Sequence, residues 1–130
     1  MPPAPVSAPL LEMRDVDMEF SLGSLVGEHT TLRALSGVSL ALEPGRALAL
    51  VGESGSGKST AARLLARVYA PARGSIGFRG EDVTHLKGAA LTRYRAEVQM
   101  IFQDPFGSLN PTRSIGYHLE RPLRLHRPSL

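Results

Sequence analysis

The chain contains no cysteine and no tryptophan, and aromatic residues make up only 5% of its 130 residues. The lack of cysteine excludes disulfide bonds and thiolate metal sites and is compatible with a reducing cytosol. The scarcity of aromatic residues argues against a protein that stacks single-stranded bases. No apolar stretch reaches the roughly eighteen residues that a membrane-spanning helix requires.

The chain also lacks a strong excess of charge of one sign. Fifteen Lys and Arg residues face twelve Asp and Glu residues, and the basic residues are scattered along the sequence. We therefore interpret them as part of a solvated surface and expect no nucleic-acid partner. The start, residues 1–5, lacks the basic and apolar parts of a signal peptide, and its prolines predict a disordered lead-in over residues 1–9. These features place the chain in the cytoplasm unless a partner tethers it to a membrane.

The most informative feature present is a glycine-rich run that fits the pattern G-x-x-x-x-G-K-[ST]. It consists of Gly52, Glu53, Ser54, Gly55, Ser56, Gly57, Lys58, Ser59 and Thr60. Glycines permit positive φ angles, and successive backbone amides in such a loop form a nest for anions. Lys58 offers a point charge to β- and γ-phosphates, and the Ser59 hydroxyl is placed to ligate Mg²⁺. The pattern predicts a binding site for a nucleoside triphosphate.

The residues on either side of this run support the interpretation. Residues 47–51 are a continuous apolar segment, which predicts a parallel strand buried on both faces. Residues 59–69 contain no glycine or proline and are rich in helix formers, which predicts a helix with its positive end at the loop. The alternative, a surface turn with a chance Lys-Ser pair, leaves this order of strand, loop and helix unexplained.

Alternation of apolar and polar residues and the turn residues predict the remaining elements. Further strands are expected over residues 10–20, 32–42, 75–79 and 98–102, with a loop over 21–31. Helices are expected within 82–95, with a break at Gly88, and over 115–125, with an interruption at Pro122. The length suffices for one modest domain with an α/β fold.

Gln103 is the second candidate site residue, because it follows directly on the predicted strand over residues 98–102. In open sheets the carboxyl ends of parallel strands meet at the ligand-binding edge, so Gln103 could reach the edge that carries the glycine loop. The oxygen of its side-chain amide can coordinate Mg²⁺, or the amide can orient an attacking water. Alternatively, Gln103 only caps the turn-rich loop that follows it.

From about Leu10 to His126 the sequence resembles the nucleotide-binding subunits of ATP-binding cassette (ABC) transporters. The resemblance rests on two strings, residues 47–60 (ALALVGESGSGKST) and residues 99–111 (QMIFQDPFGSLNP). The second string is the more specific and is similar to the form used by oligopeptide, dipeptide and nickel importers. The fold it implies is that of P-loop NTPases, an α/β fold with an N-terminal antiparallel β subdomain and part of a parallel-sheet core.

The resemblance implies roles for individual residues. Phe20 falls where the family places an aromatic side chain that stacks on adenine, although a core-facing Phe at a strand end explains its spacing equally well. Gly52 to Thr60 would bind the phosphates of ATP, and Ser59 and Gln103 would contact Mg²⁺. Gln103 and Lys58 would help to position the γ-phosphate and the water. The loop after Gln103 would contact the permease subunits, and a second nucleotide-binding subunit, identical or different, would complete the ATP site at the cytoplasmic face of the membrane.

The chain also departs from the family. It contains neither the Leu-Ser-Gly-Gly-Gln signature nor an apolar strand ending in Asp-Glu, and its four histidines do not match the γ-phosphate switch. We therefore interpret residues 10–130 as a partial nucleotide-binding domain that stops before the helical subdomain is complete. We expect it to have a partial core, exposed apolar edges and no hydrolytic activity on its own.

Three functions are candidates for this sequence. The first is the ATP-binding subunit of an importer that energises uptake of peptides or a related solute, represented here by its N-terminal part. The second is a non-catalytic nucleotide-binding or interaction module left by gene truncation, which the coding DNA beyond Leu130 would discriminate from the first. The third, a small-molecule kinase, lacks an identifiable lid and is opposed by the string around Gln103.

Overall fold

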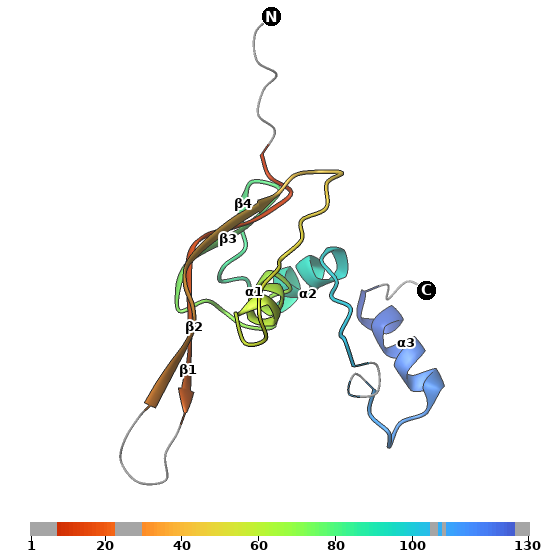
Figure 1. Cartoon of the computed structure of the whole chain (residues 1–130). Helices are drawn as coiled ribbons and strands as arrows, with labels where there is room; N and C mark the ends of the chain where they lie inside the picture. Colours follow the sequence, from red (N-terminus) through yellow and green to blue (C-terminus); the bar gives the residue numbers. More distant parts are fainter. Residues whose placement is uncertain (1–7, 23–29, 105–106, 108, 127–130) are drawn as a thin grey trace, which may run out of the picture. The chain divides into compact units, whose positions relative to one another are not determined.

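The computed structural model of the chain describes residues 8–22, 30–104, 107 and 109–126. They belong to two compact units, Met1–His85 and Leu86–Leu130 (Figure 1). In the described part of the chain, the first unit holds strands β1 to β4 and helix α1, and the second holds helices α2 and α3. The predicted disordered lead-in over residues 1–9 lies outside the described residues, apart from Ala8 and Pro9.

The first unit is built on an antiparallel sheet with the strand order β2-β1-β3-β4. Its strands are β1 (Leu11–Leu22), β2 (Thr30–Leu42), β3 (Arg73–Phe78) and β4 (Glu81–Asp82). The three strands predicted over residues 10–20, 32–42 and 75–79 are therefore confirmed. The loop predicted over residues 21–31 is shorter, because pairing continues to Leu22 and resumes at Thr30; residues 23–29 lie outside the described residues.

Irregular pairing bends the two long strands where β1 faces β2. Between the pairs Met13↔Leu40 and Val16↔Val38, β1 advances by one residue more than β2, which is a β-bulge. Asp15 there has a φ of 48°. Its N–H donates to the Ser39 hydroxyl (2.9 Å), so a polar side chain satisfies a backbone group that the bulge removes from the ladder.

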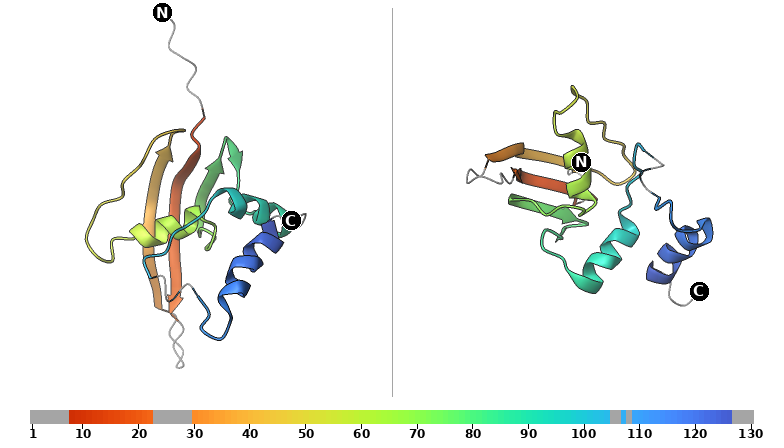
Figure 2. Two further views of the ribbon diagram at one scale, coloured as in Figure 1. Left: turned by 90° about the vertical axis from the view of Figure 1, so that its right-hand side faces the viewer. Right: turned by 90° about the horizontal axis from the view of Figure 1, so that it is seen from below.

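Helix α1 (Lys58–Leu65) lies across one face of this sheet and contacts both β1 and β2 (Figure 2). Its apolar side covers the sheet, and the core of the unit consists of Leu11, Met13, Val16, Met18, Leu35, Ala61, Leu64, Ala66, Ile76 and Val83. The helix ends earlier than the predicted residue 69, because Arg67 takes a φ of 54° that a right-handed helix cannot continue.

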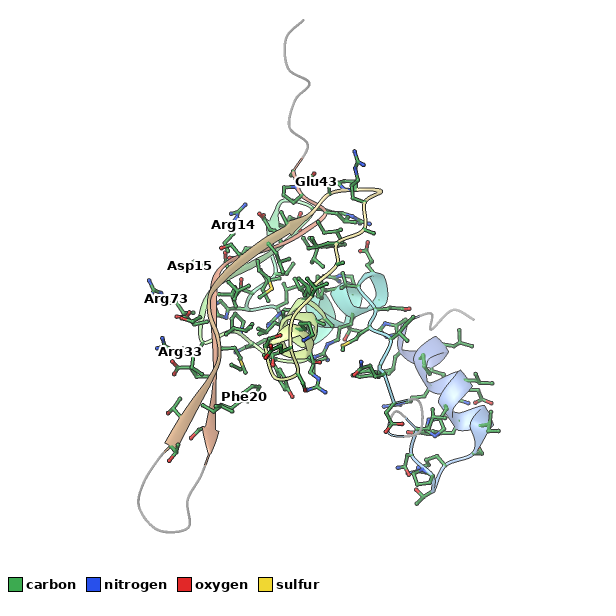
Figure 3. The ribbon with its side chains drawn as sticks, in the orientation of Figure 1. Arg14, Asp15, Phe20, Arg33, Glu43 and Arg73 are labelled. Carbon is green, nitrogen blue, oxygen red and sulfur yellow. The ribbon has the colours of Figure 1, made fainter. Side chains whose placement is uncertain are left out.

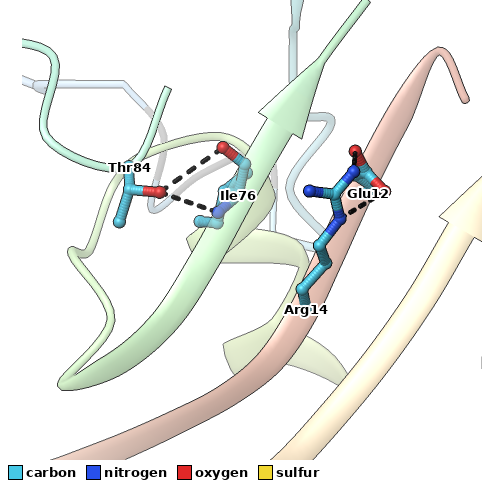
Figure 4. A network of polar contacts seen from close by, with 4 residues as sticks. All are labelled: Glu12, Arg14, Ile76 and Thr84. Carbon is cyan, nitrogen blue, oxygen red and sulfur yellow. Dashed lines mark hydrogen bonds and ion pairs between the residues drawn. The ribbon is translucent and has the colours of Figure 1, made fainter. Parts of the chain in front are cut away.

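The side chain of Thr84 bonds to backbone groups of β3 on the side of that strand away from β1. This side chain is 1% exposed, and its hydroxyl accepts a hydrogen bond from the N–H of Ile76 (2.8 Å) and faces the carbonyl of the same residue (3.4 Å), as Figure 4 shows. The side chain and the N–H of Thr84 also hydrogen-bond the carboxylate of Asp82, which lowers the pKa of Asp82. On β1, Arg14 forms a two-pronged ion pair with Glu12, which is also drawn in Figure 4.

Thr84→Val should lower the free energy of unfolding by about 1–3 kcal/mol, because the N–H of Ile76 would be buried without a partner. Urea unfolding followed by circular dichroism measures the change. Thr92→Val is the matched control, since the Thr92 hydroxyl also bonds to a backbone carbonyl but lies at an exposed position of α2. Equal changes in the two variants would contradict the role of Thr84.

The second unit contains α2 (Gly88–Glu97) and α3 (Ile115–His126), which contact each other. Gly88 begins α2 with a φ of 54°, so the helical stretch predicted within residues 82–95 starts only there; residues 81–82 form β4 instead. The helix predicted over residues 115–125 is α3, and the interruption predicted at Pro122 is wrong, because the helix runs through Pro122 without a break.

The strands predicted over residues 47–51 and 98–102 are wrong for this structure. Neither segment is paired, and Val51 and Ile101 are 90% and 96% exposed. A strand requires a neighbour to receive its backbone hydrogen bonds, and no described strand lies beside either segment. The antiparallel subdomain of the predicted α/β fold is thus confirmed, whereas the described residues form no parallel strand pair. No helix in the described ranges is both long and apolar enough to cross a membrane.

Candidate functional site

The glycine loop turns sharply and leads directly into α1. Gly55 and Gly57 have φ angles of 83° and 90°, in the left-handed region that glycine adopts without strain. The N–H of Ser56 donates to Glu53 O (3.2 Å), which closes a turn, and Gly57 is the N-cap of the helix. The last backbone amides of the loop therefore belong to the first turn of α1, where the helix dipole favours an anion.

Gly57 also fixes the loop against β2. A β-carbon at this position would lie 2.6 Å from Cδ2 of Leu35 and 2.9 Å from the carbonyl oxygen of Ala34. Ala34 is the extra residue of a bulge, since Met18 pairs with Leu35 and Glu19 pairs with Arg33. The loop thus rests on an irregular part of the sheet through a residue without a side chain.

The side chain of Lys58 folds back over the loop. Its ammonium donates to Gly52 O (2.8 Å), Glu53 O (2.5 Å) and the hydroxyl of Ser56 (3.0 Å). All three acceptors belong to exposed residues 52–56 of the loop, so the positive charge of Lys58 is held against the loop itself. A phosphate oxygen is a stronger, charged acceptor and can replace these neutral ones.

Ser59 and Thr60 occupy the first turn of α1, where Ser59 is exposed and Thr60 is half-buried. Among the described residues no group of three acidic, histidine or cysteine side chains could hold a metal ion. The hydroxyl groups of the loop therefore fit Mg²⁺ only in the way typical of nucleotide sites. In such sites one or two protein ligands bind the ion together with phosphate oxygens and water. Ser59 can supply such a ligand.

Phe20 belongs to the same unit and lies toward the end of β1 (Figure 3). It is half-buried, and its ring meets that of Tyr69 edge-to-face, with centroids 5.4 Å apart and an interplanar angle of 81°. The sequence indicates Phe20 alone, because Tyr69 stands 49 positions away and carries no motif of its own.

Gln103 is exposed and belongs to the second unit. Its approach to the glycine loop, which lies in the first unit, therefore stays a prediction. Asp104 after it is also exposed, and Pro105, Phe106 and Ser108 of the predicted contact loop lie outside the described residues. The structure thus brings together within one unit the loop, Lys58 and Ser59, with Phe20 on the sheet of the same unit.

Comparison with known proteins relates the chain to one family. The family model "ABC transporter" matches residues 35–121. The chain is 43% identical over 115 residues to the nickel import ATP-binding protein NikE of Pseudomonas putida, covering 88% of this chain and 42% of that protein. It is 41% identical over 120 residues to the oligopeptide transport ATP-binding protein AppF of Bacillus subtilis, covering 90% and 36%. It therefore spans only about two fifths of the length of these relatives.

Among solved structures, the chain resembles a dimeric post-hydrolysis state of an ATP-binding cassette bound to ADP and Pi. The TM-score is 0.57 and the sequence identity 25%, over 65% of this chain and 34% of that one. The likeness supports the P-loop type of fold that the glycine loop and α1 indicate.

Proposed function

Since the chain belongs to the ABC transporter family, we propose that it is the nucleotide-binding region of an importer's ATP-binding subunit. The observation that carries the proposal is the loop from Gly52 to Thr60, in which the Lys58 ammonium hydrogen-bonds loop residues 52–56 at the start of α1.

In the proposed complex the loop residues hold the phosphates of ATP. Lys58 exchanges Gly52 O, Glu53 O and the Ser56 hydroxyl for β- and γ-phosphate oxygens, and this change draws the loop around the ligand. Ser59 would hold Mg²⁺, which neutralises the charge that develops on the phosphates. Gln103 would act as a further contact for the metal or for the attacking water.

Phe20 is proposed to stack on the adenine base. Support comes from its position, because a half-buried aromatic ring near a strand end offers one surface to the core and another to a ligand. Stacking on a base is tolerant of sequence and is worth about 1–3 kcal/mol per base in proteins that bind nucleic acids.

The proposed partners are a second nucleotide-binding subunit and the permease, which the loop after Gln103 would contact. Support comes from the relatives, whose names describe nickel import and oligopeptide transport, and from the dimeric state of the similar cassette. We infer a peptide or related solute as cargo and a peripheral position on the cytoplasmic face of the membrane. We expect the 130-residue chain alone to show no turnover above buffer, since the sequence contains neither the Leu-Ser-Gly-Gly-Gln signature nor an apolar strand ending in Asp-Glu.

Lys58→Ala should raise the dissociation constant for Mg-ATP at least about tenfold, since a charge-assisted contact with phosphate contributes about 1.5–3 kcal/mol. Isothermal titration calorimetry on the 130-residue chain measures the change. The sequence contains one other lysine, Lys87, which is exposed at the N-cap of α2, and Lys87→Ala provides a control with the same loss of charge. Identical dissociation constants for the unchanged chain and Lys58→Ala would overturn the proposal.

A further inference from the structure

The contact between Phe20 and Tyr69 joins the sheet to the segment that follows α1. The two rings meet at an interplanar angle of 81° with centroids 5.4 Å apart, which is a favoured geometry for aromatic pairs because the positive edge of one ring faces the negative face of the other. Phe20 remains half-buried in this contact. The pair therefore constrains the tilt of the Phe20 ring and leaves part of it accessible.

The backbone that carries Tyr69 is itself firmly held. The N–H of Val68 donates to Arg63 O (2.8 Å) and that of Arg67 donates to Leu64 O (2.9 Å), the two bonds of a Schellman helix end. Arg67 occupies the left-handed position of this motif with a φ of 54°, although glycine is the usual residue there.

Arg67 combines that backbone position with a structural contact that glycine could not make. It is 6% exposed, and its Nη1 donates to the carbonyl oxygen of Tyr69 (2.9 Å). The turn after α1 is thus held by these backbone bonds, by a longer one from the N–H of Tyr69 to Arg63 O (3.4 Å) and by the side chain of Arg67. Tyr69 leaves this turn toward Phe20 in a defined direction.

We propose that Tyr69 is a positioning residue for the nucleobase: it fixes the orientation of Phe20 on which a purine stacks, and Arg67 holds Tyr69 in place. The inference rests on the proposed function, since it assigns a role within the same nucleotide site. A side chain already ordered in its binding orientation loses less conformational entropy when the ligand binds, and pre-organisation of this kind strengthens affinity without a new contact. Tyr69 therefore strengthens binding of the base, whereas binding of the phosphates depends on the glycine loop.

Two probes separate the base from the phosphates: Mg-ATP and inorganic tripolyphosphate with Mg²⁺. Tyr69→Leu keeps an apolar side chain in the turn but removes the ring, and Tyr69→Phe restores the ring without the hydroxyl. We expect Tyr69→Leu to weaken Mg-ATP binding by about two- to tenfold, the range that loss of an edge-to-face pair implies. Tripolyphosphate affinity should stay within twofold of the unchanged chain, and Tyr69→Phe should recover the affinity for Mg-ATP.

A double-mutant cycle completes the test, because residues that act as one unit are not additive. Phe20→Leu should weaken Mg-ATP binding, and adding Tyr69→Leu to it should cause little further loss. The inference is overturned if Tyr69→Leu leaves Mg-ATP affinity unchanged, if it weakens both probes equally, or if the two substitutions are additive. Failure of the unchanged chain to bind either probe would instead overturn the proposed function, and this inference with it.

Discussion

Replacing Gly74 with alanine is expected to lower the free energy of unfolding by about 2–6 kcal/mol, the sum of backbone strain and overpacking. Gly74 lies in β3 with a φ of 84°, which an alanine adopts only with strain. A β-carbon there would also lie 2.3 Å from the carbonyl oxygen of Asp15 and 2.5 Å from that of Arg14. Both contacts are with backbone, so no side chain can rotate away, and the β1–β3 pairing itself must shift.

Gly45→Ala is the matched control for this substitution. Gly45 has a φ of 70° in the turn before the glycine loop, and a β-carbon at that position would meet nothing within 4 Å. It therefore carries the strain of the left-handed backbone without the collision. Thermal or urea unfolding of both variants separates the two effects, and equal losses of stability would contradict the steric part of the explanation.

Gly57→Ala is expected to destabilise the protein by about 2–4 kcal/mol and to weaken Mg-ATP binding more than tenfold. Its φ of 90° and its contacts with Leu35 and Ala34 leave no room for a methyl group, so the loop must move away from β2. The loop amides and Lys58 would then be displaced from the positions they hold in the structure. Unfolding measurements and titration calorimetry test the two effects separately.

Gly55→Ala tests whether packing against β2 or the left-handed backbone matters more at the loop. Gly55 has a φ of 83°, close to that of Gly57, but a β-carbon there would meet nothing within 4 Å. We expect it to lose only about 1–2 kcal/mol of stability, as is usual for backbone strain alone. If Gly55→Ala and Gly57→Ala were equally destabilising, contact with the sheet would not be what holds the loop.

The local part of this structure follows from the sequence, and the part that depends on distant neighbours does not. Alternation along residues 10–20 predicts β1 because most of the apolar side chains of that strand are buried and most of its charged ones are exposed or half-buried. The apolar run over residues 47–51 predicts a buried strand equally well, yet a strand also requires a partner, and a single segment does not reveal whether one lies beside it. The strand prediction for residues 98–102 is wrong for the same reason.

The candidate site likewise has features that the sequence predicts and features that it does not. The spacing of Gly52, Gly57 and Lys58 predicts the phosphate loop, because the chemistry resides in neighbouring residues. It does not predict that Gly57 must rest on a bulge at Ala34, or that the ring of Tyr69 meets Phe20. Bulges and ring pairs depend on residues far apart in the chain, and the hydrophobic periodicity of the sequence does not predict them.

Nuclear magnetic resonance of the ¹⁵N-labelled 130-residue chain during titration with Mg-ATP tests the central claim most directly, because every backbone amide of the loop reports its own environment. The largest amide shift changes are expected between residues 52 and 60, in the unchanged chain and not in Lys58→Ala. Binding of Mg-ATP with shift changes centred outside that loop, or equally strong in Lys58→Ala, would contradict the claim that these amides and Lys58 hold the phosphates.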